Sequence, residues 1–158
     1  TNFVLNNRTS LSVGYQLLYA KDKAAERSFR NGEVFARLTP TSPSFVLSEK
    51  DYFGLFNRSR HMFNFNLSYS IPKWQFEGNF RGTYRSKFGL YDSNGNGYLD
   101  KYDDFVEGYS ILDLTLNKIF QKNFKISLGI DNFLDFKDYQ NIGNIPGRIF
   151  YGVAQLNF

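Results

Sequence analysis

The residues that could do chemistry in this sequence lie close together in one segment, YDSNGNGYLDKYDDF, at positions 91–105. Oxygen-bearing side chains recur there around Gly97 at a spacing close to D-x-[DN]-x-[DN]-G-x5-E, the pattern of an EF-hand calcium loop. The last position holds Asp103 where Glu is usual, and the alternative is a solvated acidic loop held by Asx turns. The segment predicts Ca2+ as a cofactor, with candidate ligands on Asp92, Asn94, Asn96, Tyr98 (through its carbonyl), Asp100 and Asp103.

The segments on either side decide whether that loop joins helices, as an EF-hand requires, or strands. Between Trp74 and Leu90, every second residue is apolar, aromatic or small, and the residues between them are polar or glycine. Residues 112–117 alternate Leu with Asp, Thr and Asn in the same way. A period of two is that of a β-strand with two unlike faces. The calcium-like loop is therefore predicted to join two strands, and no EF-hand is expected.

Composition narrows the class of protein. Of the 158 residues, 42% are hydrophobic and 19% aromatic, and cysteine is absent, which excludes disulfides and thiolate metal sites. The net charge is +4, but Lys and Arg are scattered among strand positions rather than gathered in a run, so we expect no nucleic-acid partner. A single His and no Ser-His-Asp arrangement argue against an enzyme.

Alternation along the whole chain predicts an all-β fold. Six segments have the pattern of strands, at 9–20, 58–70, 74–90, 108–120, 124–134 and 147–158, with residues 1–6 as the candidate tail of a seventh. Their connections alternate between long segments at 21–57, 91–107 and 135–146 and short turns at Pro72-Lys73 and Gln121-Lys122-Asn123. Every connection suits an antiparallel neighbour, and the long ones share one rim of the sheet.

Apolar and polar residues alternate in this way both in the strands of a membrane barrel and in those of a soluble β-sandwich. No apolar run approaches the roughly 20 residues of a transmembrane helix, but a strand of about 10 alternating residues can cross a bilayer. Strand length, aromatic residues near strand ends and the contrast between long loops and short turns favour the barrel. Because the smallest membrane barrels have about 8 strands, we expect this chain to be one antiparallel wall of a larger transmembrane barrel.

Two stretches of the sequence resemble a known family. The C-terminal stretch GIDNFLDFKDYQNIGNIPGRIFYGVAQLNF carries DNFLD at 131–135 and PGR at 146–148, and it ends on Phe158. It resembles the last hairpin of TonB-dependent outer-membrane transporters. NRSRH at 57–61 is similar to that family's NRPRH motif before a barrel strand, with Ser59 where Pro is common. The resemblance covers the chain from Arg58 to its last residue.

The resemblance implies a place in a larger receptor. Residues 1–158 are then the C-terminal part of a Bacteroidetes-type receptor in a Gram-negative outer membrane, the last six or so strands of a barrel of roughly 22. The plug domain and the TonB box are expected to lie outside this chain. The long loops face the outside of the cell, and the short turns face the periplasm. In the last strand, the resemblance implies an assembly signal on Phe150, Leu156 and Phe158.

The resemblance also implies partners. Membrane lipid and lipopolysaccharide surround the barrel, and the plug and N-terminal strands of the same receptor complete it. TonB binds through the part of the receptor outside this chain, and the barrel-assembly machinery reads the last strand. A surface lipoprotein is a further expected partner.

A basic cluster follows from the predicted register. If Pro72 and Lys73 form a two-residue turn, Arg60 lies opposite Arg85, Arg58 opposite Lys87 and Asn64 opposite Arg81, all on the lumen side. Positive charges in opposite positions of two strands are destabilising unless an anion lies close enough to neutralise them. That anion is either a plug carboxylate or a bound ligand. The predicted lumen cluster is Arg58, Arg60, Arg81, Arg85 and Lys87.

The resemblance implies TonB-dependent active uptake of a scarce nutrient, such as an iron chelate, haem or cobalamin. The alternatives are a glycan or peptide importer of the same superfamily, a passive outer-membrane barrel, and a soluble calcium-binding β module. The cargo is not named by any motif of the sequence.

Overall fold

The computed structural model describes residues 1–120 and 123–156, in two compact units. The strand unit comprises Thr1–Gln16, Met62–Arg85 and Tyr109–Phe158, and the loop unit comprises Leu17–His61 and Ser86–Gly108. The expected turn at Gln121 and Lys122 and the terminal Phe158 lie outside the described residues. No helix in the described part of the chain has the length and hydropathy to cross a membrane.

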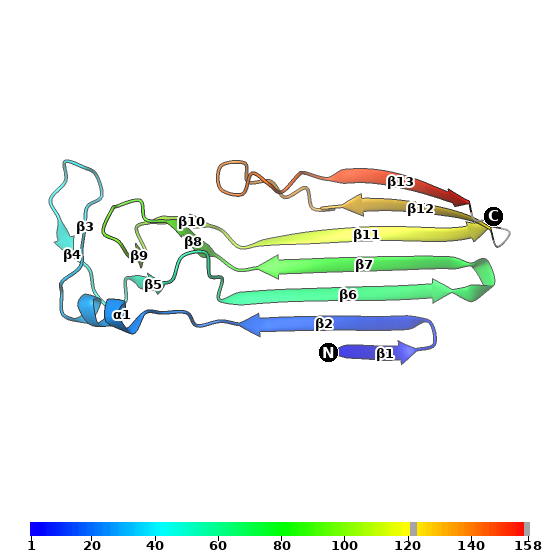
Figure 1. The fold of residues 1–158 in the computed structure, drawn as a ribbon, viewed down its shortest axis with the longest axis horizontal. Coiled ribbons are helices and arrows are strands. Elements are labelled where there is room, and N and C mark those ends of the chain that lie inside the picture. The colour runs from blue at the N-terminus through cyan, green and yellow to red at the C-terminus, as the bar shows by residue number, and fades with distance from the viewer. Residues whose placement is uncertain (121–122, 157–158) are drawn as a thin grey trace. The chain divides into compact units, whose positions relative to one another are not determined.

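The strand unit is one antiparallel sheet of seven strands in the order β1-β2-β6-β7-β11-β12-β13, so neighbours in sequence within this unit are neighbours in space (Figure 1). Each predicted strand has a counterpart in this sheet, and the tail at residues 1–6 is a strand of it. The strand predicted at 74–90 is shorter than expected, because it ends at Arg85 and Phe88–Tyr91 belongs to a separate two-stranded sheet. The bounds of the strands in the large sheet are β1 Asn2–Asn6, β2 Thr9–Leu17, β6 His61–Ile71, β7 Phe76–Arg85, β11 Tyr109–Phe120, β12 Phe124–Asp131 and β13 Ile149–Leu156.

The turn between β6 and β7 is longer than the sequence suggests, and this corrects the predicted register. A 3-10 helix, η1 (Pro72–Trp74), and Gln75 in the left-handed region at φ 50° make the connection, so Ile71 pairs with Phe76. The predicted two-residue turn is therefore wrong, and so are the pairs that it implied. Met62, rather than Arg60, lies opposite Arg85, and Asn66, rather than Asn64, lies opposite Arg81. The shift is two residues, so every side chain stays on its predicted face.

The two faces of the sheet differ in chemistry, as the alternation predicts. One cross-strand row runs through Leu67, Phe80, Leu114, Ile130 and Phe150. The adjacent row, on the opposite face, begins with Asn66, Arg81 and Asp113. The residues expected to face lipid all share the apolar side, namely Phe63, Phe65, Phe76, Phe80, Leu114, Leu116, Ile126 and Leu128.

Side chains on the apolar face pack across the strands but are not covered by another layer. The Phe65 and Phe80 rings meet edge to face at 5.2 Å, over Gly82, where a Cβ would overlap the Phe65 ring. Leu128 is 59% exposed and Phe150 is 69% exposed. An uncovered apolar surface of this kind suits a sheet whose solvent on that side is hydrocarbon.

The loop unit has a buried core of its own, which the sequence did not predict. It contains α1 (Lys23–Arg30), capped by Asp22, whose side chain accepts a hydrogen bond from the Ala24 N–H at 2.7 Å. The short strands of the unit are β3 Phe35–Ala36, β4 Phe45–Val46, β5 Tyr52–Gly54, β8 Phe88–Tyr91, β9 Leu99–Asp100 and β10 Asp104–Val106. The core residues are Ala25, Phe29, Val34, Ala36, Leu47 and Tyr52.

Contacts within this core join the two long loops. Phe29 of α1 stacks on Tyr52 at 5.0 Å and meets the edge of Tyr98, from the other loop, at 5.4 Å. Strand β5 of the first loop pairs with β9 of the second. Lys101 and Asp51 add an ion pair of 2.6 Å between the loops. Residues 21–57 and 91–107 therefore form one folded body rather than two separate loops.

The shared core generates a prediction for Phe29. Phe29→Ala should remove a fully buried ring that contacts both loops and cost about 3–5 kcal/mol of local stability. In the full-length receptor, amide hydrogen exchange should rise in both 21–57 and 91–107, while β6, β7 and β11 stay protected. Leu38→Ala is the control, because Leu38 is 67% exposed. Faster exchange in only one of the two loops would contradict a common core.

The two faces generate a second prediction, at neighbouring positions of β12. Leu128 belongs to the apolar face and Ser127 to the polar face, because they pair with Leu116 and Asn117 respectively. A nitroxide on Leu128→Cys should be quenched by oxygen dissolved in lipid, and one on Ser127→Cys by a water-soluble nickel complex. Equal accessibility of both labels to the nickel complex would defeat the assignment of the apolar face to lipid.

Candidate functional site

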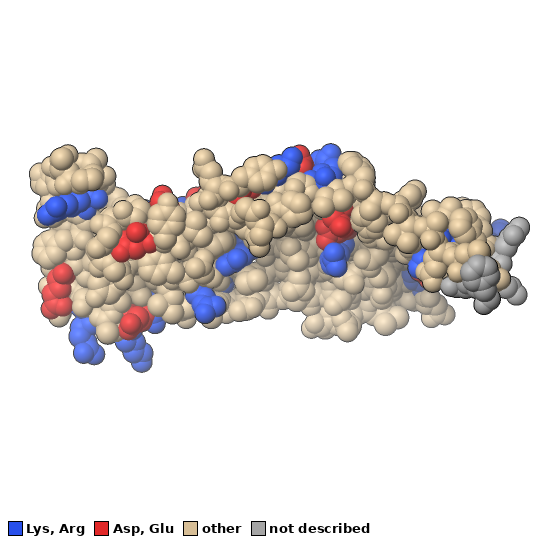
Figure 2. All heavy atoms as spheres, turned by 45° about the horizontal axis from the view of Figure 1, so that its top comes forward, with Lys and Arg blue, Asp and Glu red and all other residues tan. Residues whose placement is uncertain are grey.

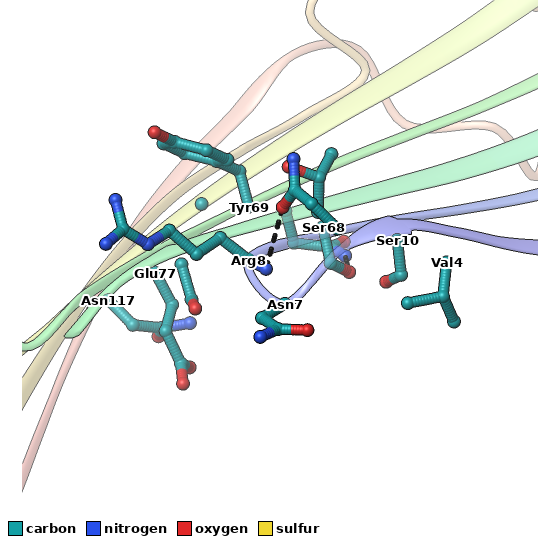
Figure 3. A pocket seen from close by; sticks show the side chains of 13 residues that line it. Val4, Asn7, Arg8, Ser10, Ser68, Tyr69, Glu77 and Asn117 are labelled. Carbon is teal, nitrogen blue, oxygen red and sulfur yellow. Dashed lines mark hydrogen bonds between the residues drawn. The ribbon is translucent and has the colours of Figure 1, made fainter.

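An open hollow of about 510 Å3 lies on the strand unit near the β1–β2 connection (Figure 3). Arg8, Glu77 and Asn117 line it together with serine and asparagine side chains of several strands. Within the described part of the chain, neither the Arg8 guanidinium nor the Glu77 carboxylate has a hydrogen bond or ion pair. The Arg8 N–H donates to Asn6 Oδ1 at 2.8 Å, the dashed line in Figure 3. One free cation, one free anion and several amides form a surface suited to binding a polar partner.

Short side-chain hydrogen bonds join neighbouring strands on the polar face, and several of the residues that make them also line this hollow. Asn79 Nδ2 donates to Asn66 Oδ1 at 2.6 Å and to Ser68 Oγ at 2.9 Å. Ser127 Oγ donates to Asn117 Oδ1 at 2.6 Å. These hydrogen bonds hold uncharged polar groups in place across the strands. A polar face of this kind is typical of the interior of a membrane barrel.

In the strand unit, the predicted basic cluster contributes Arg81 and Arg85. Both Nε and Nη2 of Arg81 donate to Asp113 Oδ2, at 3.1 and 2.9 Å, so a neighbouring strand answers this charge. Arg85 lies between Met62 of β6 and Tyr109 of β11. The Asp113 pairing was missed because it depends on the register of β7 with β11.

The other three members belong to the loop unit. Lys87 Nζ donates to a Glu107 carboxylate oxygen at 2.8 Å, and the Arg60 guanidinium lies over the Tyr19 ring at 4.4 Å. Arg58 is exposed and, among the described residues, makes no hydrogen bond or ion pair. Figure 2 shows Lys and Arg interspersed with Asp and Glu rather than gathered into one patch on the face drawn. A role of these residues toward a plug or a ligand stays a prediction.

Asp113 also fixes the start of the terminal connection. Its Oδ1 accepts a hydrogen bond from the Asn132 N–H at 2.9 Å, while Oδ2 holds Arg81. Asn132 is in the left-handed region at φ 52°, is almost completely buried, and donates through Nδ2 to the carbonyls of Phe136 and Pro146 at 2.7 and 3.0 Å. One side chain therefore closes the connection from its first to its last residues.

Asp135 of the DNFLD motif is hydrogen-bonded to the PGR motif and so joins the two ends of the connection a second time. Its Oδ1 accepts from the Arg148 N–H at 2.7 Å, and Lys137 Nζ lies 3.1 Å from Oδ2. The backbone hydrogen bond from Arg148, with help from Lys137, lowers the pKa of the Asp135 carboxyl. The motifs that carried the resemblance are thus the residues that give this connection its shape. Phe150 and Leu156 of the expected assembly signal lie on the apolar face of β13.

The calcium-like loop is folded around its own acidic and amide side chains. Asp92 accepts from the Gly95 N–H at 2.7 Å through Oδ1 and from the Gly97 N–H at 2.6 Å through Oδ2. Asn94 and Asn96 each donate through Nδ2 to Asp100 Oδ2, at 2.9 and 2.8 Å. Two of the predicted ligands, Asn94 and Asn96, therefore meet at the fully buried Asp100, and both present their amide nitrogens to it.

Asp103 is the last of the predicted ligands in this loop. Its surroundings are unfavourable for a negative charge. Its two oxygens accept from the Ser93 and Asp100 N–H groups at 2.9 and 2.8 Å. Burial raises the pKa of Asp103, and the charges of Asp100 and Asp92 raise it further, against those two backbone hydrogen bonds. Among the described residues, no three His, Cys, Asp or Glu side chains are grouped as a metal site, so any cation would depend on amide and carbonyl oxygens.

Comparison with known proteins identifies the family to which the chain belongs. The family model described as "TonB dependent receptor-like, beta-barrel" matches residues 3–133. No curated protein matches the chain.

Among solved structures, the ferric enterobactin receptor PfeA of Pseudomonas aeruginosa in complex with enterobactin is 18% identical with a TM-score of 0.63, over 99% of this chain and 21% of that one. The siderophore receptor PirA of Acinetobacter baumannii is 17% identical with a TM-score of 0.56, over 96% of this chain and 20% of that one. This chain thus spans about one fifth of either receptor, and at these identities the likeness shows the fold alone. The match to the family model covers most of the chain and agrees with the two-faced sheet, and the chain therefore belongs to the TonB-dependent receptor-like β-barrel family of the Gram-negative outer membrane.

Proposed function

We propose that this chain forms part of the barrel wall and outer loops of a receptor that takes up a scarce nutrient by TonB-dependent active transport. The observation that carries the proposal is a sheet with an uncovered apolar face and a hydrogen-bonded polar face, in a chain whose family consists of transporters and receptors. Of the candidate cargoes (an iron chelate, haem or cobalamin), we propose an iron chelate as the first to test, because the two receptors of similar fold are siderophore receptors.

The orientation in the membrane and the partners follow from the same proposal. The loop unit faces the outside of the cell, and η1 faces the periplasm. The polar face lines the lumen, where the free Arg8 and Glu77 are available to a plug domain of the same receptor. TonB acts on the plug, and that work opens the path along the polar face. A C-terminal position of the chain in a Bacteroidetes-type receptor belongs to this proposal as well.

The uncovered apolar face is the observation that separates this proposal from a soluble calcium-binding module. Side chains such as Leu128 and Phe150, each more than half exposed, would present one continuous apolar surface to water. A passive barrel shares the two faces, and energy dependence is what distinguishes it from a TonB-coupled receptor.

Uptake measurements test the proposal. Cells that carry the full-length receptor as their sole ferric siderophore receptor should accumulate radiolabelled ferric catecholate or hydroxamate chelates only when TonB is intact. The same cells without TonB should bind the chelate at the surface without importing it. Import at an unchanged rate without TonB would favour the passive barrel, and the absence of both binding and import for a panel of chelates would reject the chelate as cargo.

We also propose that the Asp92–Asp103 loop binds calcium. The spacing around Gly97 and the meeting of Asn94 and Asn96 at Asp100 support it. Burial is the main cause that raises the pKa of Asp103, and a cation would relieve the further repulsion from Asp100 and Asp92. Calcium would compete with the Nδ2 groups of Asn94 and Asn96 for Asp100, so these amides would turn their oxygens inward. The ion would order the loop and take no part in a reaction.

Calcium titration of the purified full-length receptor provides the test. Asp92→Asn combined with Asp103→Asn should lower calcium affinity at least tenfold, since two carboxylates leave the ligand set. Asp104→Asn is the matched control, one residue beyond the set, and should bind as the parent does. Isothermal calorimetry that detects no calcium binding to the parent protein at millimolar calcium, or equal binding by the double variant, would leave the loop as an acidic turn closed by its own hydrogen bonds.

A further inference from the structure

A second open hollow, of about 550 Å3, lies on the loop unit, and Asn94 and Asn96 of the calcium-like loop form part of its wall. Its walls come from residues far apart in the sequence, the β3–β4 hairpin and the tip of the second loop at residues 94–96. Side chains that line it include Phe35, Arg37, Ser44 and Asn94. Both walls belong to the one folded loop unit.

Hydrogen bonds within the loop unit hold the two walls of the hollow in place. Phe35 pairs with Val46 in the hairpin, and the Leu47 N–H donates to the Val34 carbonyl at 2.9 Å beside it. Asn96 Nδ2 donates to the Phe35 carbonyl at 3.2 Å and so ties the loop tip to the hairpin. These bonds connect the hairpin to the loop tip on both sides of the hollow.

Two polar groups in the hollow are free to bind a ligand. In the described part of the chain, neither the Arg37 guanidinium nor the Ser44 hydroxyl makes a hydrogen bond or ion pair. Among the described residues that line the hollow, Arg37 carries a charge and Ser44 a hydroxyl, so these two groups can bind an anionic group that accepts hydrogen bonds.

The exposed ring of Phe35 lines the same hollow as Arg37. Phe35 is 49% exposed, so about half of its surface can receive a flat apolar group. A guanidinium binds a carboxylate with two parallel hydrogen bonds, and it does so most specifically when a second contact fixes the orientation of the ligand. We propose that this hollow binds an organic carboxylate with a flat apolar face, the carboxylate on Arg37 and the face against Phe35.

Two kinds of molecule share this chemistry, namely aromatic carboxylates and uronic acids, whose sugar rings have one apolar face. The inference rests on the proposed function only in that the loop unit must face the outside of the cell for such a ligand to reach it. Binding to the purified receptor needs neither TonB nor the barrel-lumen path. A failure of binding and a failure of TonB-dependent uptake are therefore separate results.

The test is a titration of the full-length receptor with 4-fluorobenzoate, followed by fluorine NMR, and with sodium galacturonate, followed by saturation-transfer NMR. At least one carboxylate should bind saturably, and its neutral counterpart, 4-fluorobenzyl alcohol or galactose, should bind at least tenfold more weakly. Saturable binding of fluorobenzoate alone assigns an aromatic carboxylate, and that of galacturonate alone assigns a uronic acid. The absence of saturable binding by either carboxylate would overturn the inference, as would equal affinity for a neutral counterpart.

Three variants locate the binding in the hollow. Arg37→Gln should weaken binding about tenfold or more, equivalent to about 1.4 kcal/mol. Phe35→Leu keeps an apolar side chain but removes the ring, and it should weaken binding several-fold. Arg27→Gln is the matched control, an exposed Arg of the same unit outside the hollow, and should bind as the parent does. Unchanged affinity in Arg37→Gln, with a parental protease-cleavage pattern in the loop unit, would overturn the inference.

Discussion

The need to pair every main-chain polar group within the hydrocarbon layer is the constraint on which this structure depends. In lipid an unpaired N–H or C=O costs several kcal/mol, so a strand can cross only as a member of a continuous ladder. The seven strands satisfy this with antiparallel pairing between neighbours. The ladder in turn imposes two faces, because successive side chains point to opposite sides. Membrane contact and lumen chemistry are thus both consequences of backbone hydrogen bonding.

The two-faced sheet could be predicted from the sequence because its period is local. The alternation can be read along β7 and along residues 112–117 of β11, and the error in register left the side chains of β6 and β7 on their predicted faces. The register itself could not be read, since it depends on Gln75 taking a left-handed conformation after η1. Pairings that need the register were therefore missed, above all the bridge between Arg81 and Asp113.

The loop unit combines a local pattern, which the sequence shows, with a core formed by residues far apart in the sequence, which it does not. The ligand spacing of residues 92–103 is local and could be recognised in the sequence, and two of these side chains, Asn94 and Asn96, meet at Asp100. The core that supports this segment is not local, because Phe29 meets Tyr52 and Tyr98 only after both loops have folded together. Glycine, asparagine and proline in these segments indicate turns, but they carry no signal of which aromatic residues will meet. A helix as short as α1 is stable only through such packing.

The hydrogen bond from Asn96 to the Phe35 carbonyl has a consequence for how receptors of this kind can be recombined. A chimera that exchanged only residues 21–57 would keep an Asn96 whose acceptor had moved and a Tyr98 without the Phe29 ring. A chimera that exchanged only 91–107 would leave the Tyr52 strand without its partner β9. The two segments fold as one unit, so we expect residues 21–57 and 91–107 to be exchanged together among related receptors, although β6 and β7 lie between them along the chain.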